Sequence, residues 1–261
     1  MAGGSGAVSI QIDGNNNNGV PMNFGGRQNG ILTNYAAGLN FNNILNKKTE
    51  INGSYFFNHL DQNIDQSVER VNYTPIGNYN YNSFGRQRNS NQNHRLNFTI
   101  DHKIDSSNSI RFTTNASRSN THLSALSESE TMTTENELQN KSVTNNLTDG
   151  DGFNLTSNLL YRHRFGKKGR SFSANLNLVL SQSESNGELT AENDFYDTGE
   201  KRNVSQENSQ STDNQTLGTT LSYIEPLGNR KYLEATYNFR TNQNQVDRNV
   251  YDVNNGNRTM N

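Results

Sequence analysis

The chain has 261 residues, of which 30% are hydrophobic, and its mean hydropathy is −0.96. Soluble domains are roughly 45–50% apolar, so this composition argues against a conventional two-layer core, while 12 Phe and 11 Tyr in segments of alternating polarity argue against disorder. The net charge of −2, from 23 basic and 25 acidic residues, provides no basic surface for nucleic acid, and the lack of Cys excludes disulfides and thiolate metal sites.

The first predicted strand is a short one at residues 7–12, and an Asn- and Gly-rich loop follows at residues 13–34. Four hairpins then recur about every sixty residues, with short turns at residues 44–49, 105–109, 166–170 and 225–230. On both sides of each turn apolar and polar residues alternate, which is typical of a strand with one apolar and one wet face. The pattern predicts nine strands of about ten residues, the length that a tilted strand needs to cross a bilayer.

Long polar stretches separate the hairpins at residues 59–93, 118–151 and 182–215, and we predict them as loops. Short turns at one end and long loops at the other are the layout of an up-and-down transmembrane barrel. The sequence therefore predicts an all-β fold, namely an antiparallel up-and-down transmembrane β-barrel segment. An odd count of nine strands also predicts an open wall of a larger barrel, because single-chain bacterial barrels close with an even number of antiparallel strands.

Period-two geometry assigns each strand residue to one of two faces. Residues expected to point to lipid are Leu39, Ile100, Phe112, Leu159, Leu176, Leu178 and Leu221, and those expected to point to the lumen include Asn40, Asn97, Asn158, Asn175 and Thr220. The charged lumen-facing candidates are Glu50, Arg95, Asp101, Arg111, Arg162, Arg164, Glu234 and Arg240. They either select or guide a solute or form an ion-pair network that braces the wall, and the sequence favours the second interpretation.

Aromatic residues of the apolar parity are expected in two belts, as at the interfaces of a membrane-spanning barrel. We place Phe41, Phe165, Phe172 and Tyr223 beside the short turns. We place Tyr35, Tyr55, Phe57, Phe153, Tyr237 and Phe239 beside the long loops. A soluble β-sandwich is the alternative.

No catalytic residue, cofactor or metal site is predicted, and the protein is not expected to be an enzyme. His94 and His102 are about 25 Å apart in an extended chain, so they cannot share a metal. Residues 149–152 (DGDG) and the acidic run 188–197 lack the ligand positions of an EF-hand, and we interpret the Asp-Gly pairs as turns.

Several segments in order resemble a known family. They are DGNNNNGVPMNF, NGILTNYAAGLNFNN, KKTEINGSYFFNH, HRLNFTIDHKIDSSNSIRF and LSYIEPLGNRKYLEATYNF. Together they resemble the barrel segments of Bacteroidota-type TonB-dependent receptors. The resemblance implies a bacterial outer-membrane location and nutrient uptake through a plugged barrel of about twenty-two strands.

Partners implied by the resemblance are outer-membrane lipid, the missing barrel strands and a plug. The sequence contains no plug, TonB box or signal peptide, so coupling to the TonB system is expected only through regions outside this chain. Two alternatives stay open. One is an outer-membrane barrel with a structural or adhesive role, and the other is a secreted, soluble β-rich adhesin.

Overall fold

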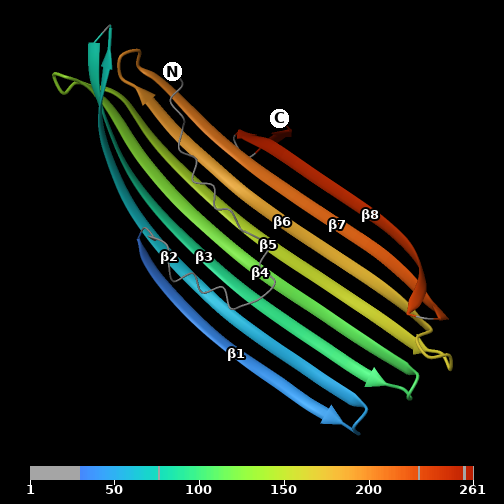
Figure 1. Cartoon of the computed structure of the whole chain (residues 1–261). Helices are drawn as coiled ribbons and strands as arrows, with labels where there is room; N and C mark the ends of the chain where they lie inside the picture. The colour runs from blue at the N-terminus through green and yellow to red at the C-terminus, as the bar shows by residue number, and fades with distance from the viewer. Residues whose placement is uncertain (1–29, 76, 229, 255–256, 261) are drawn as a thin grey trace.

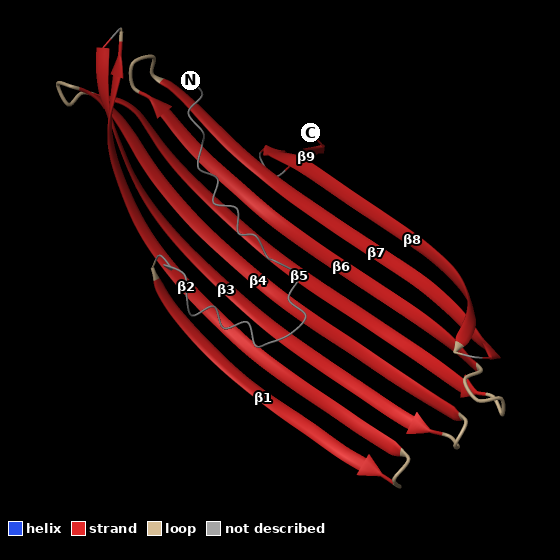
Figure 2. Cartoon of the chain, viewed as in Figure 1, coloured by secondary structure: helices blue, strands red, loops and turns tan. Residues whose placement is uncertain are grey.

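The computed structural model describes residues 30–75, 77–228, 230–254 and 257–260. Within them the chain forms a nine-stranded antiparallel sheet whose spatial order is the sequence order (Figures 1 and 2). The strands are β1 (Ile31–Leu45), β2 (Thr49–Thr74), β3 (Gly77–Lys103), β4 (Asn108–Thr133), β5 (Leu138–Arg164), β6 (Ser171–Phe195), β7 (Glu200–Gly228), β8 (Lys231–Asn254) and β9 (Asn257–Met260). None of the described residues forms a helix of the length and apolarity that a membrane span requires.

The predicted all-β, up-and-down topology is confirmed, and the sheet is open. β1 lies at one edge and β8, with the short β9, at the other, so the strands form one curved layer (Figure 1). The four predicted short turns connect β1 to β2, β3 to β4, β5 to β6 and β7 to β8, and they lie at one end of the sheet. In the first, Asn46 and Lys47 have φ values of 54° and 56°, the left-handed pair that defines a type I′ turn.

The prediction of long loops is wrong. Residues 59–93, 118–151 and 182–215 belong mainly to strands, and short turns reverse the chain at residue 75 and at residues 134–137 and 196–199. β2 to β8 are therefore 24–29 residues long instead of about ten. Of the loop predicted at residues 13–34, residues 31–34 lie in β1, and the rest, like the predicted strand 7–12, falls outside the described residues apart from Gly30.

These extra residues pair with a single register shift, between Thr131 and Met132, because hydrogen bonds to the neighbouring strands satisfy their backbone groups whatever the side chains. Their polarity does not alternate: residues 89–93 (NSNQN) put amide or hydroxyl groups on both faces. Asn is also a poor strand former in isolation. A sequence without a period-two signal and with low β-propensity thus adopts the strand conformation through its neighbours in the sheet.

The sheet has no covered core within its described part. No hydrophobic side chain there is buried, and Leu39, Leu176 and Phe239 are 74%, 43% and 50% exposed. The described strands thus leave a large apolar surface uncovered.

The two long edge strands, β1 and β8, run in opposite directions, since seven reversals separate them. Direction alone therefore does not prevent them from pairing, and at the edge beyond β8 it is the four-residue β9 that runs parallel to β1. No β1–β8 pairing exists in the part of the chain that the structure describes, so the wall stays open as predicted. Its nine strands are not the nine predicted ones, because the predicted strand 7–12 lies outside the described residues and β9 was not predicted.

Candidate functional site

The face with the apolar parity carries a continuous band of hydrophobic residues. One row of directly opposed residues contains Ile51, Ile100, Phe112, Leu159, Leu176, Thr219 and Phe239. Adjacent rows add Leu178 and Leu221. On β6 the apolar alternation runs over nine residues, from Phe172 to Leu180, which corresponds to about 30 Å of strand and, at a tilt of about 40°, to roughly 23 Å of height. We call this surface the apolar band.

Aromatic side chains flank the band at both ends, with two corrections. Phe165, Phe172 and Tyr223 lie toward the short turns, and Tyr35, Tyr55, Phe57 and Phe153 lie toward the far side, as predicted. Tyr237 and Phe239 were assigned to the far side, but Phe239 pairs with Thr219 in the row of Leu176, in the middle of the band, and Tyr237 pairs with Leu221, one row nearer the short turns. Phe41 pairs with Gly53 near the middle of the band.

The eight charged candidates lie on the opposite, polar face, but few of them pair. Glu50, Asp101 and Arg111 are directly opposed on β2, β3 and β4, and Arg111 Nη2 contacts Asp101 Oδ2 at 3.3 Å. Asn52 donates to Glu50 at 3.3 Å, and Ser222 donates to Glu234 at 3.0 Å. Arg95, Arg162, Arg164 and Arg240 make no ion pair with any described residue. The predicted bracing network is thus limited to one ion pair.

Neutral polar groups make up most of the rest of this face, among a few apolar side chains such as Phe56 and Leu160, and bond across the strands. Examples are Asn97 donating to Ser54 at 3.0 Å and Thr220 donating to Asn238 at 2.8 Å. Asn40, Asn158 and Asn175 share the face. A wall of amides and hydroxyls suits contact with water, since each group keeps a partner when solvent is present.

The five His side chains all lie on the face that carries the apolar band, at its margins or further along the strands. Nδ1 of His102 lies 2.8 Å from the Thr49 hydroxyl near the short turns, and Nδ1 of His94 lies 2.7 Å from the Tyr55 hydroxyl on the far side. His94 and His102 are therefore separate, as the sequence indicates. No group of three or more His, Asp or Glu side chains in the described ranges is arranged to hold a metal ion.

Beyond the band, the strand residues that were predicted as loops, together with 243–254 and 257–260, form what we call the extension. Fourteen of its sixteen acidic residues share the face of the apolar band: Asp61, Asp65, Glu69, Glu128, Glu130, Asp149, Asp151, Glu184, Glu188, Glu192, Asp194, Glu207, Asp213 and Asp247. Asp149 and Asp151 lie within β5, so the interpretation of the Asp-Gly pairs as turns is wrong. The common parity of Glu184, Glu188 and Glu192 was the signal available in the sequence.

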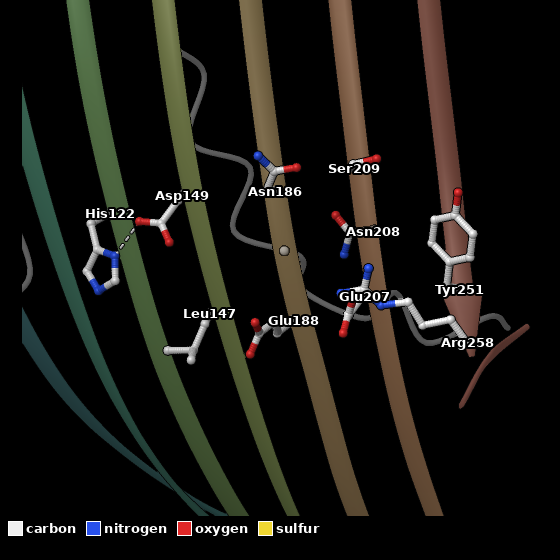
Figure 3. A pocket seen from close by; sticks show the side chains of 11 residues that line it. His122, Leu147, Asp149, Asn186, Glu188, Glu207, Asn208, Ser209, Tyr251 and Arg258 are labelled. Carbon is white, nitrogen blue, oxygen red and sulfur yellow. Dashed lines mark hydrogen bonds and ion pairs between the residues drawn. The ribbon is translucent and has the colours of Figure 1, made fainter. Parts of the chain in front are cut away.

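Six basic residues on that face each pair with one of these acids, as in Lys141–Glu130 at 3.0 Å and Lys201–Asp194 at 3.2 Å. A shallow hollow of about 440 Å³ opens among the remaining acidic residues (Figure 3). On one side of it His122 is bonded to Asp149 at 2.7 Å, and on the other side Arg258 lies beside Glu207. Hydrogen bonds from His59 and Ser90 hold the pKa of Asp61 below its ordinary value.

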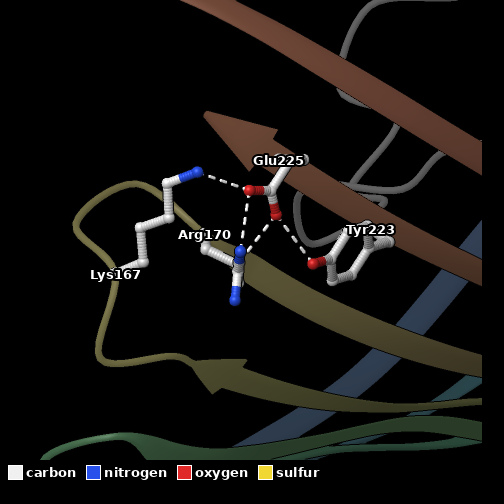
Figure 4. Close-up of polar contacts among 4 residues, drawn as sticks. All are labelled: Lys167, Arg170, Tyr223 and Glu225. Carbon is white, nitrogen blue, oxygen red and sulfur yellow. Dashed lines mark hydrogen bonds and ion pairs between the residues drawn. The ribbon is translucent and has the colours of Figure 1, made fainter. Parts of the chain in front are cut away.

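A compact polar cluster fixes the short-turn end of β5, β6 and β7, outside the apolar band. Arg170 donates twice to Glu225, at 2.6 and 2.8 Å, and Lys167 and Tyr223 donate at 2.6 and 2.8 Å (Figure 4). These donors, Arg170 first, lower the pKa of Glu225 to about 2. The cluster ties the β5–β6 turn to β7 and engages a carboxylate at that end of the sheet.

No protein-family model matches the chain, and no curated protein matches it. The functional proposal therefore depends on the two faces of the sheet and on the residues that each face carries.

Proposed function

We propose that this chain is a wall segment of a bacterial outer-membrane β-barrel receptor that takes up a nutrient in the TonB-dependent manner. The observation that supports the membrane part is the apolar band. Its face is uncovered along seven long strands, its height is close to that of a bilayer-spanning barrel, and the opposite face is polar. A soluble sandwich would need a second layer over that face.

The uptake part is supported by the polar face. It would line a water-filled lumen with neutral amides and hydroxyls and with several unpaired guanidinium groups. In this arrangement the short turns lie on the periplasmic side and the extension rises from the outer surface, as is usual for outer-membrane barrels.

Single cysteines test the membrane assignment cleanly, because the chain has none of its own. Leu159→Cys and Asn158→Cys are adjacent residues on opposite faces of β5. An environment-sensitive fluorophore at Leu159→Cys should be quenched by lipid-soluble quenchers in isolated outer membranes, and the same label at Asn158→Cys by water-soluble quenchers. Equal quenching at both sites would refute the membrane wall.

Adhesion is the competing function, and the extension favours it because the extension presents a large charged surface beyond the band. Deletion of the gene should impair growth when one nutrient is limiting if the chain serves uptake. Normal growth on every limiting nutrient, combined with lost attachment to a surface, would instead support the adhesive barrel.

A further inference from the structure

Three cations on the polar face gather at the short-turn end without a carboxylate partner. Lys103 lies opposite Ser109, which lies opposite Arg162, so the two cationic residues are two strand spacings, or about 10 Å, apart at the backbone. Arg164 is two residues further along the same face of β5, about 7 Å from Arg162. We call Lys103, Arg162 and Arg164 the basic patch.

The acids near the basic patch are already engaged. Asp101 pairs with Arg111 at 3.3 Å, and Glu225 accepts from Lys167, Arg170 and Tyr223. Asp105 accepts from the backbone N–H groups of its own turn at 2.7 Å.

The two remaining acids of the polar face outside the extension do not reach the patch. Glu234 is three strands from Arg164 along the row through Ser171 and Ile224, or about 14 Å. Glu50 lies on β2, opposite Asp101. The described chain therefore holds like charges side by side with no carboxylate in ion-pair contact to offset their repulsion.

The side chains around the basic patch leave room for a ligand. Its cross-strand neighbours are Ser109, Ser171 and Ser173, which are short and carry hydroxyl groups. Arg162, Arg164 and Lys103 are all exposed. A guanidinium group recognises carboxylate or phosphate through two parallel hydrogen bonds, and an ammonium adds a point charge.

From this arrangement we propose that the basic patch binds a solute that carries carboxylate or phosphate groups, at the short-turn mouth of the lumen. The proposal rests on the proposed function, because the patch lies at the mouth of a lumen only if the polar face lines a water-filled space. It reverses the interpretation favoured by the sequence: Arg162 and Arg164 bind an anion instead of bracing the wall.

Pyrophosphate serves as the probe, with the 261-residue chain in detergent micelles and its β-sheet signal followed during urea unfolding. A ligand that binds only the folded sheet raises the unfolding midpoint with its concentration. The apparent dissociation constant should rise about tenfold or more in Arg162→Gln/Arg164→Gln, because charge-assisted bonds are lost. Arg240→Gln, the matched control on the same face, should change it less than twofold.

Arg162→Lys/Arg164→Lys should retain part of the binding, because the charges remain and the bidentate geometry is lost. Citrate in place of pyrophosphate separates carboxylate from phosphate preference. If the chain forms little sheet alone, pyrophosphate should raise the folded fraction of the natural sequence but not of Arg162→Gln/Arg164→Gln.

An equal effect of pyrophosphate on the natural sequence, the double Gln variant and Arg240→Gln, or no effect on any of them, would overturn the proposal. Failure of the membrane assignment would look different. Fluorophores at residues 158 and 159 would then be quenched alike while pyrophosphate binding still depended on Arg162 and Arg164.

Discussion

Adjacent residues on opposite faces give the sharpest comparison at the scale of single residues. Leu176 lies in the middle of the apolar band and Asn175 on the polar face. Leu176→Arg should lower the free energy of unfolding by roughly 2–4 kcal/mol, because a cation would face the middle of the bilayer. Asn175→Arg should have little effect, since it would face water. Urea unfolding in lipid vesicles measures both, and equal tolerance would contradict the facing.

The Glu225 cluster leads to a second prediction at the scale of single residues, which concerns the stability of the sheet at acidic pH. The pKa of Glu225 is lowered to about 2 in the folded sheet, from an ordinary value of 4.5. A lowered folded pKa contributes stability that is complete above pH 4.5 and disappears as the pH falls through about 2. Glu225→Gln should therefore be less stable than the natural sequence at pH 7.

The difference between Glu225→Gln and the natural sequence should shrink below pH 4.5 and vanish near pH 2. Unfolding midpoints across this pH range provide the measurement. Glu234→Gln is the matched control, since Glu234 has only hydroxyl donors. A stability difference that is independent of pH would show that the carboxylate charge is not the cause.

The residues of the candidate site could be predicted in part. All eight charged candidates share the polar face, because period two fixes a face once a strand is identified. Their partners could not be predicted, since the Asp101–Arg111 pair depends on the register between β3 and β4. The isolation of Arg162 and Arg164 likewise becomes visible only when the strands are aligned.

At the scale of elements, the turn between β1 and β2 contains a strained backbone conformation that one substitution can relieve. Lys47 adopts a φ of 56°, which costs a side chain with a Cβ about 1–2 kcal/mol. Lys47→Gly should therefore stabilise the hairpin by roughly 0.5–1 kcal/mol after the entropic cost of glycine. Lys48→Gly has no positive φ to relieve and should destabilise it. Urea unfolding midpoints compare the two, and a loss of stability in Lys47→Gly would refute the I′ assignment.

Limited proteolysis tests the length of the strands. If residues 59–93 were a loop, trypsin would cut readily after Arg86 and Arg88. Both residues lie within β3 and are paired on both sides, so we expect little cleavage there. Lys168, in the turn between β5 and β6, is the accessible control site. Mass spectrometry of the first fragments decides, and early products ending at Arg86 would contradict the long strand.

The contrast between β6 and β3 explains what the sequence could predict at this scale. The first part of β6 alternates leucine with polar residues, so the sequence alone predicts on which face each of its residues lies. Residues 89–93 of β3 have no apolar member, so neither periodicity nor propensity distinguishes them from a loop. The hydrophobic pattern marks only the part of each strand that needs an apolar face, and pairing with neighbours continues beyond it.

For the whole molecule, the open edges determine whether the chain can form a closed barrel by itself. β1 and β8 run in opposite directions, so pairing between them is not forbidden by direction, yet the described sheet leaves both edges unpaired. In lipid, each unpaired backbone N–H or C=O group costs several kcal/mol. An eight-stranded closure would also leave an interior only wide enough for side chains, whereas the polar face outside the extension carries five arginines, with Arg95, Arg162, Arg164 and Arg240 outside any ion pair described.

We therefore expect the 261-residue chain alone to form no closed barrel. On gels, closed barrels in detergent migrate differently before and after heating, because the folded form resists the detergent. This chain should migrate identically in both samples, and a small single-chain outer-membrane barrel on the same gel is the positive control. Supplying further strands from a longer protein should restore the heat-dependent shift, since both edges would then be paired. A heat-dependent shift of the 261-residue chain by itself would show that β1 and β8 close the wall without help.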